Sequence, residues 1–313
     1  MKLIFIFLLM ILIIVFYKSN ELSLSLLEFN PFKNHINLKN TSVERFLSDG
    51  LELNKETTAS NPLEINSKSK NKPTYRNLVI VTVGNSKGNL DKNLLLNRKL
   101  RTFDIMIVFS GRAASKRMKY KHIVEHIYIN KDYKFQNLHF VYNNHRNVLD
   151  KYDRFFVLDN SIIIDIKSIN KMFDISERYK LMICAPTFKY DAAKAAKAAK
   201  AAQHRIMQSR NRNTLRYVNF IDSSVPLFNR YALDKLMKYY DPALMDDGID
   251  YLYIWACGES IADKYALVDN VTYSGSSISR SSNRNSIWDK FAKKWGIKHG
   301  KETHREWKTI PLK

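Results

Sequence analysis

Short hydrophobic runs alternate with longer, partly polar segments along the chain from residue 78 onward. The short runs are typical of buried strands, and the longer segments carry apolar residues at helical spacing. The expected strands span 78–83, 105–109, 123–129, 155–158, 182–185, 217–221, 225–228 and 265–268. The expected helices span 90–100, 135–149, 166–173, 230–240, 250–257 and 287–295. Strands that alternate with helices predict an α/β domain with a single, mostly parallel mixed sheet and flanking helices.

Several of these elements also carry residues that typically begin or end a helix or a strand. Asn229 and Ser286 are suited to cap the two helices that follow them. Gly258 and Gly296 stand where helices are expected to end, because glycine readily adopts the conformation found there. Pro186 is expected to end the strand 182–185, since proline cannot donate a ladder hydrogen bond.

The first residues differ from the rest of the chain. Residues 3–17 are uninterruptedly apolar and lie between Lys2 and Lys18. As a helix they would span ~22 Å, less than the ~30 Å hydrocarbon core of a bilayer, and signal peptides have cores of similar length. No small-residue cleavage site follows. We therefore expect an uncleaved membrane anchor helix over residues 1–19 and a single-pass membrane protein, with a removed signal peptide or a buried helix as alternatives.

The other domain boundaries follow from composition. Residues 20–75 are rich in Asn, Ser, Lys and Glu and contain three prolines, which predicts a flexible stem. Residues 76–298 carry the alternating pattern and are expected to form the globular domain, and 299–313 a basic tail. Within the domain, residues 192–202 repeat Ala-Ala-Lys, which is compatible with a solvated helix and suggests no chemistry.

The charge and the cysteines narrow the classes of function. The 313 residues include 51 Lys and Arg against 30 Asp and Glu, a net charge of +21 that attracts polyanions. No zinc-finger or RNA-binding signature accompanies the basic residues, so no specific nucleic-acid partner is expected. Cys184 and Cys257 both lie in apolar segments, where buried, unpaired thiols are expected rather than a disulfide framework or a four-ligand metal site.

Three carboxylates are candidates for chemistry. The buried run 155–158 ends in Asp159, and acids at such strand ends lie where open α/β sheets bind ligands. The alternative is an acid that accepts hydrogen bonds from loop amides. Asp250 opens an aromatic helix after Gly248, which suits a general base or simply an acid favoured by the helix dipole. Asp222 is the second candidate base.

Residues from about 77 to 297 resemble a glycosyltransferase-like domain-of-unknown-function family, the one numbered seven hundred and seven. The resemblance implies a nucleotide-diphospho-sugar transferase fold, glycosyltransferase A-like, often behind a type II membrane anchor. It is carried by the order and spacing of short segments: Phe103-Asp104-Ile105-Met106, Tyr152 to Asp159, Val218-Asn219-Phe220-Ile221, Pro226-Leu227-Phe228, Gly248 to Leu252, Tyr265 to Asp269 and Trp295-Gly296-Ile297.

The resemblance also implies a chemistry. A divalent Mn²⁺ or Mg²⁺ would neutralise the diphosphate of a nucleotide-sugar donor while the sugar passes to a glycan acceptor. Asp159 would bind the donor and the metal, and Asp250 or Asp222 would accept the proton of the attacking hydroxyl. Glycosyltransferases normally carry Asp-x-Asp at this strand end, whereas here Ser161 replaces the last acid. A histidine often follows the strand 265–268, but this chain has Tyr273-Ser274-Gly275.

The incomplete motif and the net positive charge leave three hypotheses for the function. The first is a glycosyltransferase that uses a nucleotide-sugar and a glycan acceptor. The second is a non-catalytic descendant or altered version of the fold that binds glycan or nucleotide weakly, or nothing. The third is a basic surface protein that binds anionic polymers through its excess of lysine and arginine.

Overall fold

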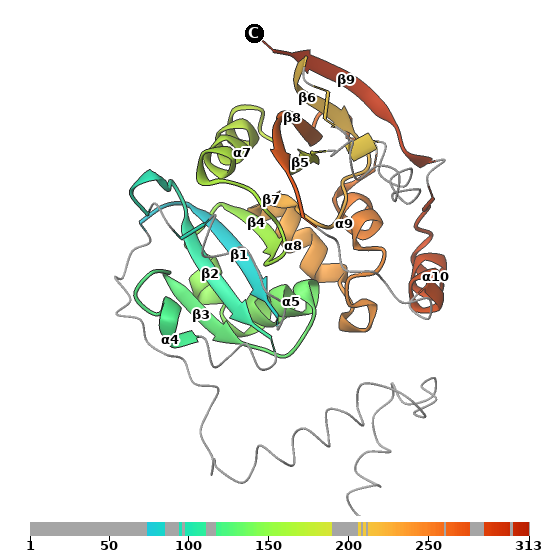
Figure 1. Ribbon diagram of the computed structural model, residues 1–313. Coiled ribbons are helices and arrows are strands. Elements are labelled where there is room, and N and C mark those ends of the chain that lie inside the picture. Colours follow the sequence, from blue (N-terminus) through green and yellow to red (C-terminus); the bar gives the residue numbers. More distant parts are fainter. Residues whose placement is uncertain are drawn as a thin grey trace, which may run out of the picture. The chain divides into compact units, whose positions relative to one another are not determined.

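Nine strands form one sheet in the part of the chain that the structure, a computed structural model, describes (Figure 1). Those residues are 74–84, 94–95, 98–110, 117–189, 206–207, 209–210, 212–259, 261–275, 285–300 and 303–312. The strand order across the sheet is β3-β2-β1-β4-β7-β5-β8-β6-β9. The strands are β1 (Asn77–Val83), β2 (Asp104–Phe109), β3 (His126–Ile129), β4 (Arg154–Asp159), β5 (Ile183–Phe188), β6 (Asn213–Val218), β7 (Leu227–Asn229), β8 (Tyr265–Tyr273) and β9 (Glu306–Pro311).

The expectation of a mostly parallel sheet is wrong, because the sheet is evenly mixed. The pairs β1–β2, β1–β4, β2–β3 and β5–β8 are parallel. The pairs β4–β7, β5–β7, β6–β8 and β6–β9 are antiparallel. An apolar run shows that a strand is buried but not which way it points, so the hydrophobic pattern could not reveal the two reversed strands, β6 and β7.

Helices cover both faces of this sheet. The helices are α4 (Arg117–Tyr120), α5 (Lys134–Asn144), α6 (Arg146–Leu149), α7 (Ile166–Arg178), α8 (Arg230–Tyr239), α9 (Ile249–Cys257) and α10 (Asn285–Trp295), with 3-10 turns η2 (Arg98–Leu100) and η6 (Pro242–Leu244). Neighbouring strand residues face opposite sides. Phe156 contacts the ring of Phe173 in α7, whereas Phe155 contacts Arg230 in α8. Helices α7 and α8 therefore lie on opposite faces of the sheet.

The positions of several elements agree with the sequence pattern, and others differ for local reasons. The Asn229 side chain accepts a hydrogen bond from the Ala232 amide, so Asn229 caps α8 as expected. Strand β5 continues through Pro186, where a register shift against β8 accommodates the missing donor. The expected helix 135–149 is divided at His145, whose backbone is not helical. Strand β8 continues past Asp269 to Tyr273.

The last expected helix begins two residues earlier than predicted, at Asn285, so that Ser286 lies within α10. Strand β9 was not predicted, and it lies in the segment 299–313 expected as a tail. Cys184 and Cys257 are buried free thiols, which confirms their interpretation. The stem 20–75, apart from its last two residues, and the Ala-Ala-Lys repeat at 192–202 lie outside the described residues.

The prediction of a single-pass membrane protein is corrected by this structure. In the part of the chain that it describes, no helix is both long and apolar enough to cross a membrane. The longest helix there, α7, has 13 residues, whereas a span needs about 20. The apolar segment 3–17, which was expected to contact the membrane, and the whole expected anchor 1–19 lie outside the described residues.

Candidate functional site

The carboxyl ends of β1 and β4 lie side by side at the point where the strand order reverses. From β1 the chain continues outward through β2 and β3, and it then returns to place β4 on the other side of β1. Thr82 pairs with Asp159 in the parallel register, and the amide of Asn160 donates to the Thr82 carbonyl at 3.1 Å. Open α/β sheets bind ligands in the crevice at such a reversal, so Asp159 occupies the expected binding edge.

Asp159 forms an ion pair with a buried lysine from another element. Its Oδ2 atom lies 2.9 Å from Nζ of Lys134, the first residue of α5. The Lys134 side chain is only 4% exposed, and that of Asp159 is 29% exposed. Nζ also donates to the carbonyl oxygens of Ser223 at 2.7 Å and Ser224 at 3.1 Å. Lys134 therefore joins the end of β4 to the loop that carries Asp222.

Asp222 is buried within this loop and shapes it. Its Oδ1 atom accepts a hydrogen bond from the Ser224 amide at 2.8 Å, which closes a local turn. Burial raises the pKa of the nearby Tyr273 hydroxyl, and the negative charge of Asp222 raises it further. The loop thus contacts both Lys134 and the end of β8. Lys134 links Asp159 to the carbonyl groups of Ser223 and Ser224, the two residues that follow Asp222.

Asp250 is buried in the first turn of α9, where the helix dipole favours a carboxylate. Gly248 caps this helix with φ 68°, a left-handed conformation that suits glycine. Tyr253 lies one turn further along the same helix face, and its hydroxyl donates to the carbonyl of Ile221. Helix α9 therefore contacts Ile221, the residue before Asp222, through the face that carries Asp250 and Tyr253.

Two further residues at this edge were not predicted from the sequence. Asp246 accepts a hydrogen bond from the Phe135 amide at 3.0 Å, in the first turn of α5. Gln136 donates through Nε2 to the Pro242 carbonyl at 2.8 Å. Lys134 was also not singled out from the sequence, although its position carried a signal. A lysine at the start of a helix opposes the dipole, and this unfavourable position was a signal that the ammonium has another partner.

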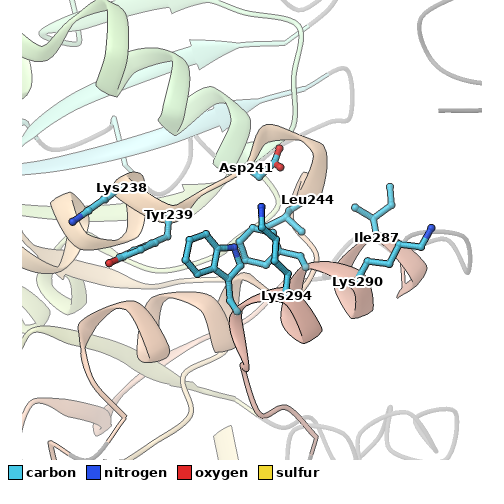
Figure 2. A pocket seen from close by; sticks show the side chains of 9 residues that line it. Lys238, Tyr239, Asp241, Leu244, Ile287, Lys290 and Lys294 are labelled. Carbon is cyan, nitrogen blue, oxygen red and sulfur yellow. The ribbon is translucent and has the colours of Figure 1, made fainter. Parts of the chain in front are cut away.

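A hollow of 540 Å³ lies between α8, η6 and α10 (Figure 2). It combines aromatic rings with three lysines, which come from the end of α8 and from one face of α10. Its lining residues are Lys238, Tyr239, Asp241, Leu244, Ile287, Lys290, Phe291, Lys294 and Trp295. Because Gln136 of α5 bonds to Pro242 of η6, the same turn contacts the carboxylate region and borders the hollow.

The described residues do not fit the divalent metal that the Asp-x-Asp resemblance implies. Mg²⁺ and Mn²⁺ prefer several oxygen ligands, usually including carboxylates. Oδ2 of Asp159 is already paired with an ammonium. Across the described ranges, no group of three or more His, Cys, Asp or Glu residues could hold a metal ion.

No protein-family model and no curated protein matches this chain. Solved structures with a distant likeness include residues 1–349 of S. aureus TarS in complex with UDP-GlcNAc, at 11% identity and TM-score 0.46, covering 72% of this chain and 68% of that one. A GalNAc-T7 structure with UDP, GalNAc and Mn²⁺ has 11% identity and TM-score 0.45, with 82% and 57% covered. A longer S. aureus TarS structure has 12% identity and TM-score 0.48, with 72% and 41% covered.

This chain thus spans less than two thirds of two of those three proteins. The ligands in those structures are properties of those proteins. Membership of the family that residues 77–297 resemble stays a prediction. What the structure of this chain defines by itself is a mixed α/β domain with a carboxylate at the strand-order reversal.

Proposed function

We propose that this domain binds a nucleotide-sugar at the carboxyl ends of β1 and β4 and transfers the sugar to a glycan acceptor, as glycosyltransferases of the A type do. The position of Asp159 carries the proposal, because Asp159 ends β4 beside β1 at the strand-order reversal, and open α/β sheets typically hold nucleotides at such a reversal. The resemblance of the short sequence segments to a glycosyltransferase-like family supports the same class.

In this proposal Asp250 is the general base. A base must accept the proton of the attacking hydroxyl, and a carboxylate in the first turn of a helix suits this step. Through Tyr253 the same helix contacts Ile221, the residue before Asp222. Asp222 is the second candidate, because its loop is held against Asp159 through Lys134.

The hollow between α8 and α10 is the proposed acceptor surface. Sugar rings pack on flat aromatic side chains, and Tyr239, Phe291 and Trp295 offer such rings. Lys238, Lys290 and Lys294 would favour an acceptor with anionic groups. The contact between Gln136 and Pro242 relates this surface to the carboxylate region.

One observation favours a second candidate function, a non-catalytic domain that keeps the fold and binds glycan or nucleotide. Asp159 is neutralised by Lys134 instead of lying in a carboxylate cluster. Such a site can retain an affinity for nucleotides while it lacks the cation that normally assists departure of a diphosphate.

Incubation of the full chain with a panel of nucleotide-sugars separates these functions. Released nucleoside diphosphate, measured by a coupled assay, supports the transferase. Donor binding by calorimetry without release supports the non-catalytic domain. Absence of both overturns the proposal, and salt-sensitive binding of anionic polymers in that case would favour the basic surface protein.

A further inference from the structure

Lys134 occupies a position that is costly for a cation in two ways. It is the first residue of α5, where the helix dipole disfavours positive charge. Its side chain is 4% exposed, and a buried charge is destabilising unless it is paired and hydrogen-bonded. Both costs must be offset by the contacts that the ammonium makes.

Those contacts satisfy the ammonium completely. A protonated lysine has three N–H donors. Its acceptors are Oδ2 of Asp159 at 2.9 Å and the carbonyl oxygens of Ser223 at 2.7 Å and Ser224 at 3.1 Å. The acceptors come from the end of β4 and from the loop before β7, so one cation holds together two segments that are far apart in the sequence. A carboxylate and two carbonyl groups are also the kinds of ligand that a hard metal ion takes.

The two other places where the Asp-x-Asp resemblance would supply metal ligands are occupied by different chemistry. Ser161 replaces the second acid, and its carbonyl lies so close to Gly275 that a Cβ there would be 2.4 Å away. Ser274 and Ile163 exchange two backbone hydrogen bonds, of 2.7 and 3.0 Å. Ser274 and Gly275, the described residues that follow β8, therefore pack on this turn through their backbone and bring no imidazole or carboxylate to it.

We propose that the Lys134 ammonium takes the place of a divalent metal ion at this site, so that Asp159 is not a metal ligand and nucleotide binding here needs no divalent cation. The statement about nucleotide binding rests on the proposed function, whereas the statement that Asp159 is not a metal ligand does not. Lys134 is a positioning residue: its donors are all used within the protein, and it acts through Asp159 and the 223–224 backbone. A metal ion that used these three acceptors would have to displace the ammonium.

Titration of the full chain with Mn²⁺, followed by electron paramagnetic resonance of the free ion, tests the first part without any nucleotide. The expected result is no saturable binding that depends on Asp159, so that wild type and Asp159→Asn give the same curve. Saturable binding that Asp159→Asn abolishes would overturn the proposal. This readout decides whether Asp159 is a metal ligand even if the proposed sugar transfer proves wrong.

A second experiment measures the dissociation constant of UDP in EDTA and in MnCl₂. For wild type the two values should agree within about twofold. A gain of about tenfold or more with Mn²⁺ would contradict metal-independent binding. Failure of UDP to bind in either buffer counts against the proposed function, and the Mn²⁺ titration then stands alone.

Substitution of the lysine tests positioning. Lys134→Met removes the cation and should weaken UDP binding, whereas Lys134→Arg keeps a cation and should restore most of the affinity. Lys167→Met is the matched control, because Lys167 also lies in the first turn of a helix but is exposed. Wild-type affinity in a folded Lys134→Met protein would overturn the positioning role. If Lys134→Met does not fold, Lys134→Arg and the Mn²⁺ titration decide.

Discussion

Arg216 of β6 and Asp269 of β8 are both fully buried and share two hydrogen bonds, from Nε to Oδ2 at 2.8 Å and from Nη2 to Oδ1 at 3.1 Å. Nη1 of Arg216 also donates to Glu306 of β9 at 3.1 Å, and Nη2 to the Ile206 carbonyl at 2.9 Å. This paired geometry offsets the cost of burying the guanidinium. One arginine thus connects three adjacent strands at the edge of the sheet.

Arg216→Met should therefore be strongly destabilising. The change leaves Asp269 buried without its main cation, which typically costs about 3 to 5 kcal/mol. Urea denaturation measures the loss of unfolding free energy. Arg98→Met serves as the control, since Arg98 is 60% exposed in its pair with Glu125 and should matter far less. Equal losses of unfolding free energy in the two variants would refute the claim that burial makes the Arg216 ion pair important for stability.

A second buried network predicts an unusual pH dependence. The Tyr152 hydroxyl donates to Oδ2 of Asp104 at 2.9 Å, and Nε2 of His126 lies 2.8 Å from the same hydroxyl. Burial, reinforced by the charge of Glu125, raises the pKa of Asp104 from 3.8 to about 6. Burial, reinforced by Lys151, lowers the pKa of His126 from 6.5 to about 4. Both groups therefore disfavour their charged forms in the folded protein.

The two shifts act in opposite directions between about pH 4 and 6. The stability from Asp104, whose pKa is raised, is complete below 3.8 and is lost as the pH rises through about 6. The stability from His126, whose pKa is lowered, is complete above 6.5 and is lost as the pH falls toward 4. Each contribution is about 3 kcal/mol at most, so in wild type they largely cancel.

Substitution of either residue should reveal the pH dependence of stability that the other residue causes. In Asp104→Asn the unfolding free energy should rise more steeply with pH between 4 and 6 than in wild type. In His126→Gln it should fall relative to wild type over the same range. Urea denaturation at several pH values measures both slopes. Parallel curves for the three proteins would show that the pKa shifts are not coupled to folding.

Gly248→Ala should destabilise the start of α9. A Cβ at residue 248 would lie 2.0 Å from the ring of Trp288, and the φ of 68° is strained for alanine. Overpacking of this kind costs about 1 to 3 kcal/mol, measurable by thermal unfolding. Gly84→Ala is the control, because nothing lies within 4 Å of its Cβ position. In a Trp288→Ala background, Gly248→Ala should destabilise the protein less, because the clash with the ring is gone. If Gly248→Ala is equally destabilising there, the whole effect comes from the strained φ.

Asp250→Asn tests the proposed general base. Loss of a base typically lowers turnover by about 10² to 10⁴-fold, while donor affinity should change little. The measurement is the rate of nucleoside diphosphate release with a bound acceptor. Asp174→Asn, at an exposed position of α7, is the control for the loss of one negative charge. Full activity of Asp250→Asn with loss in Asp222→Asn would transfer the role to Asp222.

The strands with continuous apolar runs were predictable from the sequence. Strands β1, β2 and β4 are buried on both faces, so every residue in their centres is apolar. Strand β9 is an exposed edge strand with the sequence Glu-Trp-Lys-Thr-Ile-Pro, which lacks such a run. Its pairing with β6 depends on partners such as Arg216 and Glu306, and no local pattern indicates them.

The candidate site was predictable only in part. The position of Asp159 at a strand end followed from the apolar run before it. Its partner Lys134 is 25 residues away, and Ser223 is another 89 residues from that lysine. Contacts of this range arise from the order of strands in the sheet, which the hydrophobic pattern does not specify. The sequence therefore indicated an acid at the end of this strand and missed the cation that neutralises it.

Strand β7 has only three residues, yet it joins β4 to β5 and so connects the two halves of the nine-stranded sheet. It makes three register pairs with β4 and two with β5. Few backbone hydrogen bonds therefore hold the two halves of the sheet together at β7, and few need to break for the halves to separate. Amides of β7 should exchange with deuterium ahead of those in β1 and β8, each half behaving as its own cooperative unit.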